Sequence, residues 1–387
     1  MRFSRRMDNL APYLFAQMEL KIAEKRKSGV DVISLGIGDP DLPTPAYIVE
    51  EMQRQVADAR NHPYPSNWGL AEFGEAVAAF YKRRFGVDID PKKEFFPVLG
   101  AKEGLAHICW AILDSGDLSL VPDPGYPVYS GCSIMAGAEV RYLRLKPANG
   151  FLLDLDDISE EDARRAKVLF IGYPNNPTAA VVEDDFFERV VAFAKKYDLI
   201  VVHDNAYSEL TYDGYVAPSF LAAPGAKDVG VEFFSFSKPF NMTGWRIGFA
   251  VGNHDVLAHL WRLKTNMDSG MFDALQRTGA FILNSPWDSV SQMCDVYKRR
   301  RNLLAEALVS VGMDVPKPKA TIYMWIPVPE GYTSGSFTEH VLDQAGVVVT
   351  PGSGYGPAGE GFVRLSLTTP DDRIAEAVQR IEKSLRL

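Results

Sequence analysis

Short apolar runs alternate with longer helical patterns between about residues 45 and 285. Five of these runs are almost continuously apolar, as expected for strands whose two faces are both covered by helices. The alternation of such strands with helices is typical of a parallel sheet built from strand–helix–strand units. The five predicted strands are residues 95–99, 118–121, 168–171, 199–202 and 231–236.

Each predicted strand is followed by polar or turn-forming residues. Because parallel strands end at the same edge of a sheet, we expect these segments to gather along one rim, where α/β proteins bind their ligands. The segments are residues 100–104, 122–126, 172–177, 203–207 and 237–238.

The pattern changes after about residue 285. A long helical pattern at 290–308 leads into a strand-like run at 321–326, and an alternating strand follows at 362–367. In the last helical pattern, apolar residues recur on one face. We therefore predict an α/β fold with a large domain over residues 45–285 and a smaller α+β domain over 286–387, with which residues 1–44 pack.

Composition and charge exclude several function classes. With 387 residues and 47% hydrophobic content, the chain can bury two cores. A net charge of −9 without a basic stripe argues against nucleic acid. No segment suits a membrane span or a signal peptide, so we expect a cytoplasmic protein. The three cysteines and six histidines lack metal-type spacing, and no histidine pairs with a second ligand at helical spacing, so no metal site is expected.

A lysine set between hydroxyls follows the fifth predicted strand, in Ser235-Phe-Ser-Lys238, and Arg246 lies eight residues further on. The amine of Lys238 can form a Schiff base with a carbonyl, while Ser235, Ser237 and Arg246 suit a phosphate. An aldehyde that carries a phosphate is pyridoxal 5′-phosphate, so this segment predicts a site for that cofactor. The alternative is a surface lysine in a polar turn.

Other strand ends offer side chains that suit the same cofactor. Asp204 can keep the ring nitrogen protonated, and Tyr207 and Asn176 can donate to the phenolic oxygen. Tyr126 can stack on the ring, and the strand–helix junction at Ala101-Lys102 can contact the phosphate. Each residue also has a simpler explanation, as a turn former, a helix connection or a packing tyrosine.

Together these segments resemble the class I and II aminotransferases of fold type I, essentially from end to end. The Ser-x-Ser-Lys run with Arg246, the Asn176-Pro turn, the Asp-x-Ala-Tyr segment at 204–207 and the late Arg364 occur in the family's order and approximate spacing. The resemblance implies a pyridoxal-phosphate-dependent transferase fold, with a mostly parallel central sheet flanked by helices in the large domain and a smaller α+β C-terminal domain. It also implies amino-acid and 2-oxo-acid substrates and ping-pong transamination.

The resemblance implies a role for each matching side chain. Lys238 would form the aldimine and carry the proton, with Asp204 at the pyridine nitrogen and Tyr207 and Asn176 at the phenolic oxygen. Tyr126 would stack on the ring. The phosphate would be bound by Ala101, Lys102, Ser235, Ser237 and Arg246.

The resemblance also extends to the substrate and to a partner chain. Arg364 would bind the substrate α-carboxylate, and Gly38 and Tyr13 would border the substrate pocket. Tyr64 is similar to the tyrosine that reaches the phosphate of the partner subunit, which implies a homodimer with shared active sites. Ser269 is a weaker candidate for another contact across that interface.

Within the family, four segments are most similar to the LL-diaminopimelate aminotransferases: residues 11–15, 32–45, 173–180 and 347–352. This resemblance implies conversion of LL-2,6-diaminopimelate and 2-oxoglutarate to tetrahydrodipicolinate and glutamate in lysine biosynthesis.

The chain departs from that subfamily at three places. Pro239-Phe240 stands where Thr-Tyr is usual, residues 66–69 lack a second aromatic–Glu pair, and Asn205 replaces a small residue. We expect these changes to border the cofactor or the entrance of the site.

Several alternatives share the predicted site. They are an alanine, aspartate or glutamate aminotransferase of broad specificity, and a carbon–sulfur β-lyase. A cofactor-sensing transcription regulator would need a basic N-terminal DNA-binding domain, and the large-domain pattern begins too early for one. A catalytically silent homologue is disfavoured because Lys238, Asp204 and Arg364 are all present.

Overall fold

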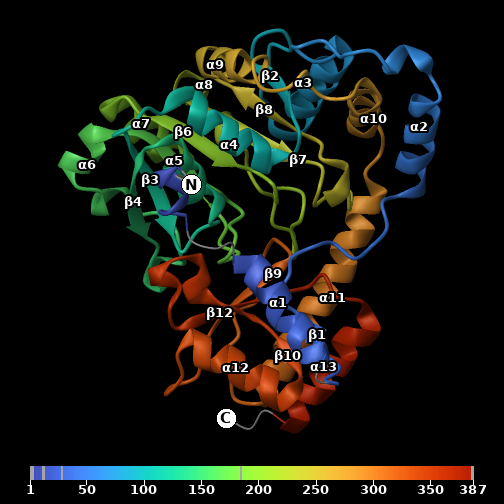
Figure 1. Ribbon diagram of the computed structural model, residues 1–387, viewed down its shortest axis with the longest axis vertical. Helices are drawn as coiled ribbons and strands as arrows, with labels where there is room; N and C mark the ends of the chain where they lie inside the picture. Colours follow the sequence, from blue (N-terminus) through green and yellow to red (C-terminus); the bar gives the residue numbers. More distant parts are fainter. Residues whose placement is uncertain (1–3, 11–13, 28, 184, 385–387) are drawn as a thin grey trace.

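The computed structural model describes residues 4–10, 14–27, 29–183 and 185–384 (Figure 1). Its main feature is a seven-stranded sheet in the order β2-β8-β7-β6-β5-β3-β4. Helices cover both faces of this sheet, and a smaller part with its own short sheets lies beyond one edge (Figure 1). The strands are β2 (Phe95–Val98), β3 (Leu118–Asp123), β4 (Glu139–Arg144), β5 (Ala166–Ile171), β6 (Ile200–Asp204), β7 (Gly230–Ser235) and β8 (Gly248–Gly252).

The large sheet is mostly parallel, as predicted. Strands β4, β3, β5, β6 and β7 pair in parallel, whereas β8 runs antiparallel to both of its neighbours, β7 and β2. All five predicted strands are present. The sequence did not predict β4, an edge strand whose side chains are mostly exposed, or β8, whose opposite direction places its end away from the predicted rim.

Alternating strand residues enter two separate apolar layers. Val98, Phe170 and Phe233 face one layer together with α4 (Ala101–Ile112), α5 (Val128–Ala136) and α9 (His254–Lys264). Their chain neighbours Leu169 and Phe234 face the other layer. The helices of that second layer include α3 (Ala71–Phe85), α7 (Phe186–Tyr197) and α10 (Asp273–Asn284), which packs in turn on α2 (Ala46–Val56). Burial on both faces explains why these strands read as continuous apolar runs.

The smaller part contains a three-stranded antiparallel sheet of order β11-β12-β9 and a pair of short parallel strands, β1 and β10. The predicted strands at 321–326 and 362–367 and the helix at 290–308 are confirmed. The elements are β1 (Ile33–Ser34), β9 (Tyr323–Pro327), β10 (Val347–Val348), β11 (Thr350–Pro351), β12 (Phe362–Ser366), α1 (Leu14–Lys27), α11 (Asp288–Ser310), α12 (Ser334–Ala345) and α13 (Asp371–Ser384).

The long helix α11 extends from the region beside α10 down to the smaller part (Figure 1). The domain boundaries at residues 45 and 285 therefore stay a prediction. The seven-stranded sheet does lie within residues 45–285, and the strands of the short sheets lie outside that range. Among the described helices, none is long and apolar enough to cross a membrane.

The loop that follows β1 is fixed to the smaller part and faces the large sheet. Pairing of β1 with β10 positions its start, and the Thr350 hydroxyl donates to the Gly36 carbonyl at 2.9 Å. The almost fully buried Arg300 of α11 holds its far end. This guanidinium donates to Asp41 at 2.7 Å and to Asp371 at 2.6 Å. Arg300 thus links the loop to α11 and α13.

Replacing Arg300 with leucine should destabilise the protein by about 3–5 kcal/mol, because two carboxylates would lose a buried partner. The midpoint of urea unfolding measures this loss. Arg299→Leu is the matched control: Arg299 also pairs with Asp371 but is 60% exposed, so its loss should cost at most about 1 kcal/mol. Equal effects of the two substitutions would contradict this account of the loop.

Candidate functional site

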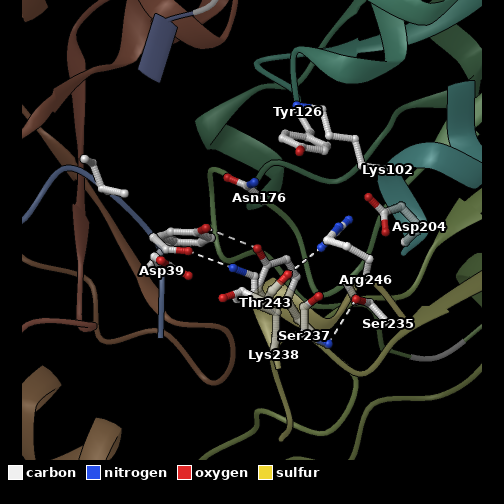
Figure 2. A pocket seen from close by; sticks show the side chains of 16 residues that line it. Asp39, Lys102, Tyr126, Asn176, Asp204, Ser235, Ser237, Lys238, Thr243 and Arg246 are labelled. Carbon is white, nitrogen blue, oxygen red and sulfur yellow. Dashed lines mark hydrogen bonds between the residues drawn. The ribbon is translucent and has the colours of Figure 1, made fainter. Parts of the chain in front are cut away.

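A cavity of about 260 Å³ opens at the carboxyl ends of the parallel strands, between the large sheet and the loop after β1. Figure 2 shows Lys238, Ser235 and Ser237 on one side of it and Asp39 on the other. Most predicted site residues line this cavity. They are Gly38, Ala101, Lys102, Tyr126, Asn176, Asp204, Tyr207, Ser235, Ser237, Lys238 and Arg246.

Lys238 follows β7 and reaches across the cavity. Its Nζ donates to the carbonyl oxygen of Gly38 at 2.7 Å, and the two residues are 200 positions apart in the chain. Burial of the amine lowers the pKa of Lys238, while Tyr323 and Asp39 oppose this effect. An amine with a lowered pKa is a better base and nucleophile near neutral pH than an exposed lysine.

Asp204 is the last residue of β6, and its carboxyl group lies at the opposite side of the cavity floor. Its Oδ2 accepts a hydrogen bond from the Tyr129 hydroxyl at 3.0 Å. Its buried Oδ1 has no hydrogen-bond partner among the described residues. Burial raises the pKa of Asp204 to about 6, although Tyr129 and the adjacent His203 act in the other direction. A buried carboxylate oxygen without a partner suits a ligand that carries an N–H group.

A cradle of hydrogen-bond donors that suits an anion lies between β7 and the start of α4. Arg246 adopts a left-handed backbone with φ of 57°, and its Nη1 donates to the Thr243 carbonyl at 2.6 Å. Gly100 beside it has a φ of 84°, a backbone conformation that favours glycine, and a Cβ there would lie 2.3 Å from Arg246 Nη2. Since α4 begins at Ala101, the first N–H groups of this helix, a guanidinium and the hydroxyls of Ser235 and Ser237 converge on one place.

Arg364 is completely buried on β12 and is therefore not a surface residue of that strand. Its Nη1 donates to Asn176 Oδ1 at 2.9 Å and its Nη2 donates to the Gly36 carbonyl at 2.8 Å. The guanidinium carbon also lies 3.9 Å from the ring centroid of Tyr323 and 4.9 Å from that of Tyr355. These contacts fix the guanidinium in one orientation next to the cavity.

Sequence reasoning missed several residues of the site. Tyr323 and Asp39 line the cavity, and Tyr129 contacts the carboxylate of Asp204. Tyr323 lies in a continuous apolar run, which signals burial but no chemistry. Asp39 could have been predicted, because it is a carboxylate directly after Gly38 in the loop segment already expected to border the substrate pocket.

Other predicted residues lie apart from the cavity. Tyr64 is 89% exposed and Ser269 is also exposed. Tyr13 falls outside the described residues. Asn205 does not itself line the cavity, because its buried side chain donates to Glu232 Oε1 at 2.9 Å, but its two chain neighbours, Asp204 and Ala206, both do.

Two further departures from the subfamily also lie away from the cavity. Phe240 is buried against Phe236 and Trp287, and Trp68 stacks on Trp261 with ring centroids 4.5 Å apart. Neither side chain lines the cavity.

The expectation that no histidine stands at helical spacing from a second metal-binding residue is wrong for His107. Glu103 and His107 do stand at helical spacing on α4, and their carboxylate oxygen and Nδ1 are 2.6 Å apart. Asp268 lies in the same cluster. The ammonium group of Lys264 contacts both Glu103 and Asp268, so a cation already balances these carboxylates.

Residues 30–381 match the aminotransferase class I and II family. The chain belongs to this family. A relative from Moorella thermoacetica, an LL-diaminopimelate aminotransferase, is 53% identical over 385 residues, which cover 100% of this chain and 99% of the relative. A relative of the same name from Aquifex aeolicus is 49% identical, again over 100% of this chain and 99% of its own length.

Several solved structures resemble this one closely. Substrate-bound BacF from Bacillus subtilis has a TM-score of 0.95 and 36% identity, over 99% of this aminotransferase and 98% of BacF. A probable N-succinyldiaminopimelate aminotransferase from Thermus thermophilus has a TM-score of 0.90 and 37% identity, over 96% and 100% of the two chains. The predicted fold type is therefore confirmed.

The cofactor of this aminotransferase is pyridoxal 5′-phosphate, which enzymes of the family use. The residues present fit it. The unpartnered Asp204 Oδ1 suits a protonated ring nitrogen, and the cradle around Gly100 and Arg246 suits a phosphate. Lys238 lines the same cavity as these two features.

Replacing Asp204 with asparagine should stabilise the cofactor-free protein at pH 8. Because folding raises this pKa from 3.8 to about 6, the ionised carboxylate opposes folding at high pH, and this penalty disappears as the pH falls through the range from 6 to 4. The gain should reach about 3 kcal/mol at pH 8 and fall to about half of that at pH 5. Urea unfolding at the two pH values measures it, and a gain that does not depend on pH would contradict the burial of this charge.

Proposed function

We propose that this aminotransferase exchanges an amino group between LL-2,6-diaminopimelate and 2-oxoglutarate, in lysine biosynthesis. One observation carries the proposal: eight relatives, 49–53% identical over nearly their whole length, share the name LL-diaminopimelate aminotransferase. The similar solved structures are named for several different substrates, so the fold alone does not select one.

In this proposal the chain's own residues hold the reacting groups and move the proton. Pyridoxal phosphate, when bound, supplies an electron sink for the electron pair that is left when the Cα–H bond of the substrate breaks. Lys238 holds the cofactor through Nζ and then carries the proton, a task for which its lowered pKa suits it. Asp204 Oδ1 accepts from the ring nitrogen, and Tyr207 and Asn176 donate to the phenolic oxygen.

The remaining roles follow from the walls of the cavity. Ser235, Ser237, Arg246 and the first residues of α4, Ala101 and Lys102, bind the phosphate, and Tyr126 covers one face of the ring. Arg364 binds the substrate α-carboxylate, because Asn176 and the Gly36 carbonyl already hold its guanidinium in a fixed direction. Gly38 borders the substrate through its backbone.

A homodimer in the cytoplasm completes the proposal. Tyr64 is 89% exposed at the tip of a loop, and Trp68 and Met267 nearby are also exposed. The high exposure of the Tyr64 side chain supports the proposal that it contacts the phosphate site of a partner subunit. An interface there would also bury these apolar side chains.

The proposed substrate carries a second ammonium group and a second carboxylate at its far end. Among the described residues, the carboxylates that line the cavity are Asp204 and Asp39. Asp204 is committed to the cofactor ring in this proposal. Asp39 is exposed at the opening of the cavity, next to Gly38, and is the carboxylate available to pair with the far ammonium.

The cofactor-loaded protein should lose its visible absorbance rapidly with LL-diaminopimelate and recover it with 2-oxoglutarate. Stopped-flow absorbance with LL-diaminopimelate, glutamate, alanine, aspartate and cystathionine side by side measures this half-reaction. Inertness of LL-diaminopimelate beside rapid alanine or aspartate would favour a broad-specificity aminotransferase, and release of pyruvate from cystathionine would favour a β-lyase. As a matched variant, Asp39→Asn should slow LL-diaminopimelate about tenfold and leave glutamate nearly unchanged.

Replacing Lys238 with alanine should reduce transamination by at least roughly a thousandfold, because the proton carrier is lost. Steady-state glutamate formation measures the effect. Lys102→Ala is the control, because it removes one proposed phosphate contact and should weaken cofactor binding with a smaller loss of turnover at saturating cofactor. Near-normal transamination by the Lys238 variant would refute the assignment.

A further inference from the structure

Two buried tyrosines meet at the side of the cavity next to Gly38. The hydroxyl oxygens of Tyr207 and Tyr323 lie 3.1 Å apart, so one donates a hydrogen bond to the other. Both rings are almost completely buried, and both line the cavity. Tyr207 follows β6 in the large sheet, whereas Tyr323 begins β9 in the smaller part. The pair therefore joins the two walls of the site.

The surroundings of Tyr323 leave its hydroxyl little freedom. Its ring covers the guanidinium of Arg364 at 3.9 Å. On the other side, a Cβ at Gly38 would lie 2.2 Å from the Tyr323 oxygen, so the backbone of the loop passes directly beside this hydroxyl. The carbonyl of the same Gly38 accepts from Lys238. The Tyr323 hydroxyl is thus fixed between the loop and Tyr207.

The charges around the pair decide which hydroxyl donates. Burial raises the pKa of Tyr207 well above its usual value, and contact with Tyr323 adds to this rise, while Arg364 lowers it and Asp204 raises it slightly. Burial also acts to raise the pKa of Tyr323, but the positive charges of Arg364 and Lys238, with hydrogen bonds to Tyr207 and Arg364, lower it. The guanidinium of Arg364 lies 3.9 Å from the centroid of the Tyr323 ring, and a positive charge beside that ring favours Tyr323 as the donor of the pair.

We propose that Tyr323 is a positioning residue for Tyr207: it donates to the Tyr207 hydroxyl and so leaves the Tyr207 proton to point into the cavity. The inference rests on the proposed function, in which Tyr207 donates to the phenolic oxygen of the cofactor. A hydroxyl that accepts one hydrogen bond becomes a stronger donor of its own, because each bond polarises the next. Tyr323 thereby tunes a contact that it does not itself make.

The experiment is a pH titration of the visible absorbance of the cofactor-loaded, full-length protein. A hydrogen bond donated to the phenolic oxygen draws charge from that oxygen and weakens its hold on a proton at the Lys238 nitrogen. Tyr323→Phe should therefore move the midpoint to higher pH by about half a unit. The ring still covers Arg364 in this variant, so KM for glutamate should change by less than about threefold.

Three further variants separate the possible outcomes. Tyr355→Phe alters the other ring over Arg364 and should leave the midpoint unchanged. Gly38→Ala leaves Tyr323 in the sequence but should also raise the midpoint, because its Cβ would lie 2.2 Å from the Tyr323 oxygen and 2.4 Å from Cε1 and so displaces this ring from Tyr207. It provides a second, independent test of the same contact. Tyr207→Phe should raise the midpoint most.

A midpoint that does not move in Tyr207→Phe would overturn the proposed role of Tyr207 itself. If Tyr207→Phe moves the midpoint and neither Tyr323→Phe nor Gly38→Ala does, the positioning role of Tyr323 is wrong. A downward shift in Tyr323→Phe would overturn it as well, because the direction of donation would then be reversed.

Discussion

The hydrogen bond from Lys238 Nζ to the Gly38 carbonyl joins the two parts of the chain that form the cavity. Lys238 is placed by the end of β7, and Gly38 by a loop whose two ends are anchored on β10 and Arg300. Neither wall forms a site alone. The parallel sheet brings its polar ends to one edge, and the loop converts that open edge into an enclosed space in which charges interact strongly.

Burial in this cavity shifts the pKa values of two of its charged groups. Burial lowers the pKa of the Lys238 amine and raises that of the Asp204 carboxyl, so each group resists its charged form. A cofactor with an aldehyde and a protonated ring nitrogen removes both penalties, because the amine reacts and the carboxylate gains a partner. Buried groups whose charged forms are destabilised in this way are typical of sites that bind a ligand.

The sequence predicted most of the fold because burial on both faces leaves a direct trace, a continuous apolar run followed by polar residues. It predicted Lys238, Asp204 and Asn176 for the same reason, since each stands at the end of such a run. It did not predict Tyr323, whose contact with Tyr207 joins residues 116 positions apart. An apolar run indicates that its side chains are buried, but not which residues they meet from another part of the chain.

Two buried carboxylates on neighbouring strands, Glu232 and Asp204, have different roles: one stabilises the fold and the other is available to a ligand. Glu232 of β7 is fully satisfied: it accepts from a cluster consisting of Tyr81, His203, Asn205, Ser219 and the backbone of Phe220. Asp204 of β6 accepts from Tyr129, and its second oxygen has no partner among the described residues. A saturated carboxylate fixes the strands in register, and nothing remains for it to bind. Asp204, which follows His203 of that cluster directly in the chain, keeps one carboxylate oxygen available for a ligand.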